Sequence, residues 1–326
     1  MRRQARRAAP HERRVVSVRS LEERPGRGSG SVTLPNFIVI GAAKAGTTAL
    51  HWYLAEHPQV FMTPVKETNY FAFGLDDEGR LLYGDPELHR FPIRSLEEYE
   101  RSFDGAGGAV AVGEASPIYL EAPRAAARIA EVIPGARILC GIREPVDRAY
   151  SDHLMYLRSR GRRLDPARDL TPSAAWAAPD SHWMQISRYY EPLRRYFDTF
   201  PRQQIHVFLF DDLKKDQAGV VRDLYRFLGV DPGFAPDFAT PHNIGGMPSS
   251  MLVEKVLTSG RLKEALEPWV PKRAADLARR VRTRNMRRPP PLPPELRAVL
   301  LENFRDDIDK TAGLIGRDLS AWLRSG

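Results

Sequence analysis

The chain has 326 residues, of which 42% are hydrophobic and 28% are charged, a balance that excludes a wholly disordered protein. No apolar run approaches the roughly 18–20 residues that a membrane-spanning helix needs, so no integral membrane segment is expected. The net charge of +8 is uneven, because residues 1–30 hold nine Arg against three Glu, whereas the remainder has 40 basic and 38 acidic residues. The nearly neutral remainder argues against a body that binds nucleic acid.

Residues 1–34 are rich in Arg and lack hydrophobic periodicity, which predicts a flexible Arg-rich tail ahead of a single domain over residues 35–326. The tail lacks the apolar stretch of a signal peptide. Cys140 is the one cysteine of the sequence and lies in an apolar run, so neither a disulfide nor a cysteine-based zinc site is expected. These features favour the cell interior, and we expect a cytoplasmic protein.

Short apolar runs alternate with helical patterns along most of the chain. Strands are expected over 36–40, 109–112, 137–142 and 205–210, and helices over 47–57, 122–133, 145–157, 186–200, 218–228, 262–282 and 294–312. Residues 74–95 and 158–183 are irregular, as lids or acceptor-binding loops often are. The alternation predicts an α/β fold with a mostly parallel central sheet and helices on both faces.

The first expected strand leads into a loop of small residues, Gly41–Gly46, and then into Thr47 and Thr48 at a helix start. Small residues let the backbone turn its N–H groups inward, and a helix N-terminus adds unpaired donors and partial positive charge. Lys44 adds a full charge, so the sequence predicts a phosphate-binding loop. Its spacing is similar to that of a P-loop, but position 47 is Thr and the lysine is displaced to position 44.

The run Lys44-Ala45-Gly46-Thr47-Thr48 resembles the 5′-phosphosulfate loop of sulfotransferases that use 3′-phosphoadenosine 5′-phosphosulfate (PAPS). A second run, Ile142-Arg143-Glu-Pro-Val-Asp-Arg-Ala-Tyr-Ser151, is similar to the 3′-phosphate motif of this family, and the resemblance assigns Arg143 and Ser151 to that phosphate. The resemblance extends over most of residues 36–324 and is strongest for the heparan-sulfate type and its bacterial relatives. It implies a three-layer P-loop-kinase-like fold, with PAPS as co-substrate and no metal.

The segment Lys66-Glu67-Thr68-Asn69-Tyr70 resembles the stretch that carries the catalytic base in the heparan-sulfate group. By this resemblance Glu67 takes the acceptor proton, while Asn69 and Tyr70 are expected to bind the acceptor. A carboxylate suits this role, because a hydroxyl is a weak nucleophile until its proton is removed. The alternative interpretation is a solvated charge pair between Lys66 and Glu67.

Two further regions are assigned through the same resemblance. Glu114 ends the second expected strand and so points to the same edge of the sheet, where we expect it and Tyr119 to bind the acceptor; a neighbouring cation is the alternative partner of Glu114. The next residue is Ala115 where the eukaryotic relatives have Lys, a departure that weakens the case for a polysaccharide acceptor. The late Lys-Gly-Arg loop of that group is matched by Arg287, with Arg288 in place of the missing Lys; the alternative is the end of a solvated basic helix.

Together these residues predict an enzyme that transfers a sulfuryl group from PAPS to a hydroxyl, less readily an amine, of a carbohydrate, glycolipid or secondary-metabolite acceptor. Glu67 is expected to act as base in an in-line displacement, and Lys44 to stabilise the developing charge. Three alternatives stay open. They are a P-loop kinase or NTPase using ATP and magnesium (207–212 resembles a Walker B strand), a non-catalytic nucleotide-binding protein, and a module that docks through its Arg-rich tail. The sequence predicts neither the acceptor nor the oligomeric state.

Overall fold

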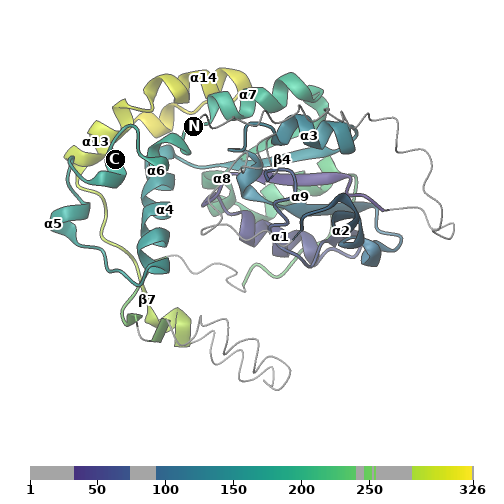
Figure 1. The fold of residues 1–326 in the computed structure, drawn as a ribbon, viewed down its shortest axis with the longest axis horizontal. Coiled ribbons are helices and arrows are strands. Elements are labelled where there is room, and N and C mark those ends of the chain that lie inside the picture. Colours follow the sequence, from purple (N-terminus) through teal and green to yellow (C-terminus); the bar gives the residue numbers. More distant parts are fainter. Residues whose placement is uncertain (1–32, 74–92, 240–245, 252, 255–280, 325–326) are drawn as a thin grey trace, which may run out of the picture. The chain divides into compact units, whose positions relative to one another are not determined.

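A central parallel sheet organises the computed structural model, which describes residues 33–73, 93–239, 246–251, 253–254 and 281–324 (Figure 1). Within these residues the sheet has the strand order β2-β3-β1-β4-β5 and every pairing is parallel. Its strands are β1 (Phe37–Gly41), β2 (Val60–Met62), β3 (Ala111–Ala115), β4 (Arg137–Ile142) and β5 (Ile205–Leu209). The three central strands are buried on both faces, which explains their continuous apolar runs.

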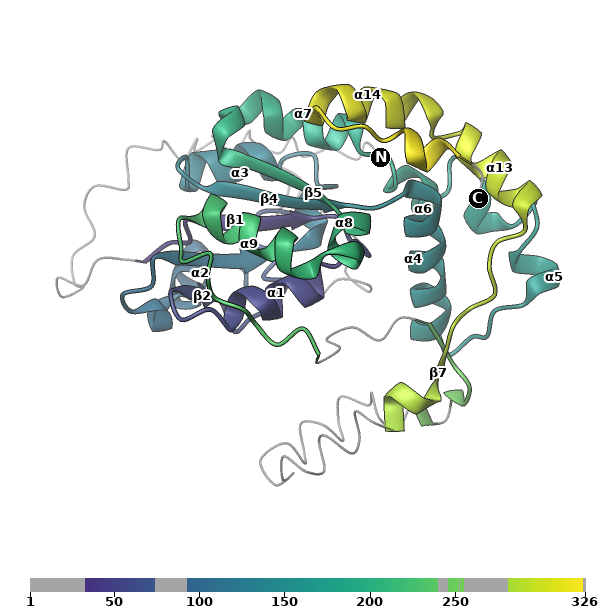
Figure 2. The same cartoon turned by 180° about the vertical axis from the view of Figure 1, so that it is seen from behind.

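Alternate residues of β1 divide the core into two parts. Phe37 and Val39 pack with α1 (Thr47–Ala55), α8 (Phe210–Lys215) and α9 (Gln217–Leu228). Ile38 and Ile40 face the opposite core, to which the remaining helices contribute. Those helices include α2 (Leu96–Arg101), α3 (Ala125–Val132), α4 (Pro145–Ser159), α6 (His182–Gln185), α7 (Tyr190–Thr199), α13 (Pro294–Glu302) and α14 (Arg305–Ile315). Figure 2 shows α1 and α9 on one face of the sheet and α3, α7 and α14 on the other, so the three-layer α/β prediction is confirmed.

Smaller elements complete the described part of the chain. The antiparallel pair β6 (Met247–Pro248) and β7 (Met286–Arg287) packs near α4. The short helix α5 (Pro166–Asp169) and the 3₁₀ helices Asp104–Ala106, Pro117–Tyr119, Ala175–Ala177, Arg202–Gln204 and Ser320–Leu323 lie in connections. No helix of the described residues is long and apolar enough to cross a membrane.

The expected elements largely match, with four differences. The expected strand 109–112 lies instead over β3, because the polar Glu114 is buried within the sheet. The three-residue edge strand β2 and the helix α2 were not predicted, and 158–183 contains the short helix α5 and the first two residues of α6. The expected helix 294–312 breaks into α13 and α14 beside the fully buried Phe304.

Other expectations fall on residues outside the described ranges. They concern the tail up to residue 32, residues 74–92, and the helix over 262–282 except at its end, where 281–285 are helical. Cys140 is buried in β4, as expected of a core thiol.

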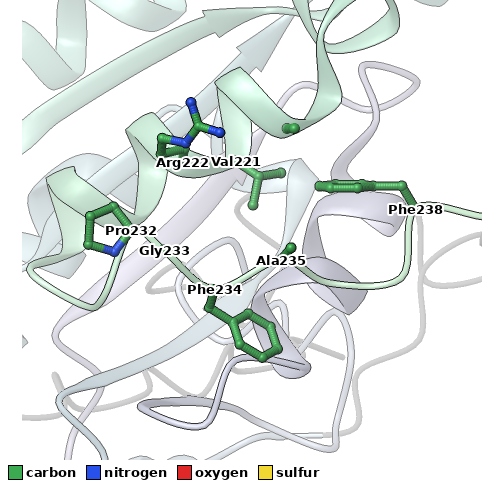
Figure 3. Close-up of a pocket in the computed structure, with 8 residues that line it drawn as sticks. Val221, Arg222, Pro232, Gly233, Phe234, Ala235 and Phe238 are labelled. Carbon is green, nitrogen blue, oxygen red and sulfur yellow. The ribbon is translucent and has the colours of Figure 1, made fainter.

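A small cavity of about 100 Å³ lies between α9 and the segment that follows it. Figure 3 shows Val221 of α9 and the Phe238 ring beside this hollow, with Pro232 and Phe234 on the connecting segment. None of the residues predicted for the functional site lines it.

The close packing of the Phe37 ring on Gly113, in the neighbouring strand, can be tested by substitution. These residues are paired in register, and a Cβ atom at position 113 would lie 2.3–2.5 Å from atoms of the Phe37 ring. We expect Gly113→Ala to lower the free energy of unfolding by about 1–3 kcal/mol, measured by urea denaturation, because the ring must move. Phe37→Leu in the same chain should recover part of that loss.

The matched control is Gly135→Ala, since nothing lies within 4 Å of a Cβ atom built there. This variant should leave stability nearly unchanged. Additive losses in the Gly113→Ala, Phe37→Leu double variant would contradict the proposed clash.

Candidate active site

The predicted site residues gather along one edge of the sheet. Because β1, β3 and β4 are parallel neighbours, the segments after them leave from the same edge. The Lys44 loop follows β1, Arg143 follows β4, and Glu67 donates its backbone N–H to the Ala115 carbonyl at the end of β3, at 3.2 Å. The structure therefore brings the three sequence motifs to one place.

The loop between β1 and α1 has the features of an anion-binding turn. Gly46 precedes the helix with a φ of 88°, and a Cβ atom there would lie 2.9 Å from Leu213, so glycine is required. No side chain caps α1, and its first turn holds no acidic residue. The backbone donors of that turn, with buried Thr47 and half-buried Thr48, are therefore available to an external anion.

Within this loop, the Lys44 side chain extends to helix α4. Its Nζ is 3.4 Å from the Sδ of Met155, a weak acceptor that carries no charge. Burial lowers the pKa of Lys44 to about 8; Asp152 opposes this shift, whereas Arg158 and Arg143 add to it. A lysine desolvated among other cations gains strongly from a bound anion.

Arg143 joins the second motif to the Lys44 loop. Its Nη1 donates to the Lys44 carbonyl at 3.4 Å, its Nη2 is 3.6 Å from Asp147, and the guanidinium lies over the Phe210 ring at 5.1 Å. The Nε is buried and has no partner in the structure. Tyr189 holds the backbone at this point by donating its hydroxyl to the Arg143 carbonyl at 2.8 Å. Arg143 thus retains an unused buried donor, as a ligand-binding arginine would.

Ser151 and Arg148 lie one helical turn apart on α4 and differ in burial. Ser151 is half-buried and stands one helical turn before Met155, on the face that meets Lys44. Arg148 is fully buried, donates to Ser187 at 2.8 Å and pairs with Asp152 at 3.0 Å. Arg148 is therefore part of the core, whereas Ser151 faces the Lys44 loop.

Glu67 lies in a loop of unusual backbone conformation. Glu67 and Asn69 have φ values of 61° and 56°, in the left-handed region that costs non-glycine residues roughly 1–2 kcal/mol each. The Glu67 side chain is 48% exposed and forms an ion pair with Lys66, so the charge pair named as the alternative is present. Asn69 is buried, and Tyr70 stacks on Tyr99 with ring centroids 4.8 Å apart.

His51 of α1 lies beside this loop and was not predicted. Burial lowers the pKa of His51 to about 4; the cation of Lys66 adds to the shift and Glu67 opposes it. Its imidazole is therefore neutral at neutral pH, and its Nδ1 is buried without a partner in the structure. In the sequence, His51 lies one helical turn after Thr47 of the predicted phosphate-binding loop, and this spacing was the signal that could have placed it near the site.

Glu114 and Tyr119 do not face an acceptor. Both side chains have 0% exposure, and the Glu114 carboxylate accepts hydrogen bonds from Thr68, Ser116, Tyr99 and Tyr119. The expectation that they bind the acceptor needs this correction, because both side chains are fully buried and the Glu114 carboxylate is already occupied by hydroxyl donors of the protein. The sequence placed Glu114 at the correct edge of the sheet but did not predict that its side chain is fully buried.

Arg287 and Arg288 lie near the carboxyl end of α4. Arg287 of β7 donates its Nε to the Ser249 hydroxyl at 2.7 Å, and Arg163, which follows α4, donates to the Ser249 carbonyl at 3.3 Å. Arg288 is exposed. Figure 1 shows β7 beside that end of α4. Two residues after Arg288, the Pro290 carbonyl accepts a hydrogen bond from the hydroxyl of Tyr150 on α4 at 2.9 Å.

The acidic residues after β5 are engaged in ion pairs. Asp211 accepts from Trp322 at 3.0 Å and pairs with Lys214 at 2.8 Å, while Asp212 pairs with Arg317 at 2.7 Å. No group of three or more His, Cys, Asp or Glu side chains in the described ranges is arranged to hold a metal ion.

A large open cavity of about 960 Å³ adjoins Arg143. It is lined by Asp147, the ion-pair partner of Arg143, together with residues after β5, the proline-rich segment 289–292 and the C-terminal residues 317–324. Ligand sites of this fold class open at this edge of the sheet. None of the residues predicted for the functional site lines this cavity, and its lining includes five carboxylates, those of Glu144, Asp147, Asp211, Asp212 and Asp318.

Comparisons with known proteins agree with this geometry. The model of the sulfotransferase family matches residues 35–235. A crystal structure of a sulfotransferase from Alicyclobacillus acidocaldarius is 32% identical, covers 90% of this chain and 100% of that one, and superposes with a TM-score of 0.64.

Curated relatives match over a smaller share of their own length. The bifunctional heparan sulfate N-deacetylase/N-sulfotransferase 4 of Mus musculus is 26% identical over 89% of this chain and 31% of its own. The membrane-associated sulfotransferase kil1 of Dictyostelium discoideum is 30% identical over 41% of this chain and 25% of its own. The chain thus spans about a third or less of these relatives.

The electrostatics of Lys44 can be tested without knowledge of the reaction. After ¹³C-methylation of the lysines, we expect the Lys44 resonance to titrate near pH 8, because burial and neighbouring cations destabilise its charge. Inorganic pyrophosphate should raise that value, since an anion favours the ammonium form, and should bind more weakly as the pH rises above 8. Lys44→Arg identifies the resonance, and a titration near pH 10.5 would contradict a buried, cation-crowded site.

Proposed function

The chain belongs to the sulfotransferase family, and from that premise we propose that it transfers the sulfuryl group of PAPS to a hydroxyl or amine of a small-molecule or glycan acceptor. The observation that carries the proposal is the contact between the two phosphate motifs. Arg143 reaches the Lys44 carbonyl, so two cationic side chains from separate motifs stand together at one edge of the sheet.

The residues of the site suit a nucleotide with anionic groups at both ends. We assign the phosphosulfate to Lys44 and to the backbone and hydroxyl donors of 45–48, and the 3′-phosphate to Arg143 and Ser151. The buried Nε of Arg143 supports this assignment, because it is a donor that a phosphate oxygen would satisfy. Arg287 and Arg288 are proposed as further contacts to the donor, because Pro290, which follows them, accepts a hydrogen bond from Tyr150, the neighbour of Ser151.

The proposed chemistry is an in-line displacement at sulfur. Glu67 accepts the proton of the acceptor while the acceptor oxygen or nitrogen forms its bond to sulfur. The bond between sulfur and the bridging oxygen of the phosphosulfate breaks, and 3′-phosphoadenosine 5′-phosphate (PAP) leaves. Lys44 and the first-turn amides of α1 stabilise the negative charge that grows on that oxygen. Asn69 and Tyr70, next to Glu67 in the loop, are proposed to contact the acceptor.

A kinase or NTPase using ATP and magnesium is the second candidate, favoured by the two acidic residues directly after β5. Those residues are already paired with Lys214 and Arg317, and a kinase gives Arg143 and Ser151 no phosphate to bind. Ligand binding separates the two functions, because PAP carries a ribose phosphate and ATP does not.

We expect PAP to bind the protein at least tenfold more tightly than AMP, without added metal, because Arg143 and Ser151 recognise the 3′-phosphate. Isothermal calorimetry measures both affinities. Arg143→Ala should weaken PAP about 10–100-fold and leave AMP nearly unchanged, since the loss of a charge-assisted bidentate contact is worth roughly 1.5–3 kcal/mol. Equal affinities for PAP and AMP, or a clear preference for ATP with magnesium, would refute the assignment.

The base is tested by Glu67→Gln, which keeps the side-chain shape and removes the proton acceptor. We expect kcat to fall by about 10²–10⁴-fold, with PAP affinity unchanged. Turnover is followed by transfer of ³⁵S from PAPS to two probe acceptors, 4-nitrophenol and a heparan polysaccharide with free amino groups. The matched control is Glu131→Gln, an exposed glutamate of α3; a Glu67→Gln enzyme as active as this control would show that Glu67 is not the base.

A further inference from the structure

A buried carboxylate beneath the Glu67 loop has its four acceptor positions filled by hydroxyl groups. The Oε1 of Glu114 accepts from Tyr99 at 2.8 Å and Tyr119 at 2.9 Å, and its Oε2 accepts from Thr68 at 2.6 Å and Ser116 at 2.7 Å. An ionised carboxylate offers about four such positions, so this arrangement matches the charged form. Burial raises the pKa of Glu114, and the four hydroxyl donors act against that shift.

Two backbone N–H groups of the loop donate to hydroxyls that in turn donate to Glu114. The Thr68 hydroxyl also contacts the hydroxyls of Tyr119 at 2.9 Å and Ser116 at 3.4 Å, and in these two contacts the donor is not assigned. The Asn69 N–H donates to the Ser116 hydroxyl at 3.1 Å, and the Phe71 N–H donates to the Tyr119 hydroxyl at 3.4 Å. Each of these two hydroxyls accepts a hydrogen bond from the loop and donates one to Glu114. A donor in place of the carboxylate would oppose other donors and disrupt the loop contacts.

The same network holds the loop where its backbone is strained. Thr68, whose hydroxyl donates to Glu114, lies between Glu67 and Asn69, the two residues of this loop with left-handed φ values. Its side chain is fully buried, and that of Glu67 is half-exposed. Anchoring Thr68 below therefore fixes the direction in which the neighbouring Glu67 carboxylate leaves the loop.

The network is also attached to β1, the strand that leads into the Lys44 loop. The Ser116 N–H donates to Val39 of β1 at 3.1 Å, and the Leu120 N–H donates to Ile40 at 2.9 Å. Thus the segment 116–120 bonds on one side to the Glu67 loop and on the other to the end of β1. The same segment therefore supports both the loop that carries Glu67 and the strand that leads to Lys44.

We propose that Glu114 is a positioning residue, which holds the Glu67 loop through Thr68, Ser116, Tyr99 and Tyr119 and so fixes the base relative to Lys44 without touching donor or acceptor. This inference rests on the proposed role of Glu67 as base. Proton removal depends steeply on geometry, so a loosened loop lowers turnover while leaving donor binding intact.

The test compares two variants at position 68, assayed with the same two probe acceptors. Thr68→Val removes the hydroxyl and keeps the shape, and we expect kcat to fall about 10–100-fold. Thr68→Ser keeps the hydroxyl and should restore kcat to within about threefold of the native enzyme. PAP affinity and the KM for PAPS should change less than twofold in both, because the Lys44 loop and Arg143 are untouched.

A double variant separates positioning of the base from a general structural effect. In a Glu67→Gln background Thr68→Val should have little further effect on kcat, because no base remains to be positioned. An equal loss in both backgrounds, or no loss in the native background, would overturn the inference. A Glu67→Gln enzyme with native kcat would instead refute the base itself, and retained PAP binding would leave the donor assignment standing.

Should Thr68→Val fail to fold, Tyr99→Phe provides the second test. It removes one donor to Oε1 and leaves Tyr119 in place, so we expect a several-fold loss of kcat and faster hydrogen exchange at the Asn69 and Phe71 amides. Native kcat and native exchange in Tyr99→Phe would overturn the inference.

Discussion

Positive charge concentrated at the carboxyl edge of the sheet is the constraint on which the rest of the site depends. Lys44 is desolvated, three arginines add to the repulsion on its ammonium, and Arg143 reaches back to the backbone of the same loop. Such an arrangement is unfavourable in isolation, because like charges repel more strongly away from bulk water. A bound polyanion would relieve the repulsion.

Parallel strand order explains how distant segments meet there. Residues 41–48, 143–151 and the loop around residue 67 are separated in sequence, yet β3, β1 and β4 are adjacent and end at the same edge. In the proposed function, the two sides of this group of strands have different roles. The side of β1 and β4 provides cations for the donor, and the side of β3 supports the loop that carries the base.

The sequence predicted those parts of the site that are local. A strand, a small-residue loop with Lys44 and a helix start are contiguous, and this arrangement was recognisable from its spacing. Arg143 and Ser151, on one strand end and the next helix, were recognisable from their resemblance to a known motif. The depth of Glu114 was not, because its partners Tyr99 and Thr68 lie 15 and 46 residues away and become neighbours only through folding. The edge strand β2 has three residues, too few for a clear alternation pattern, and the break at Phe304 depends on tertiary packing.

Met155 gives this arrangement a further property. A carboxylate at that position of α4 would form a permanent partner for Lys44 and compete with any incoming ligand, and another cation would repel the ammonium further. A soft, polarisable thioether at 3.4 Å does neither. The thioether occupies the space beside the amine without neutralising its charge, so the Lys44 ammonium can still attract an incoming anion.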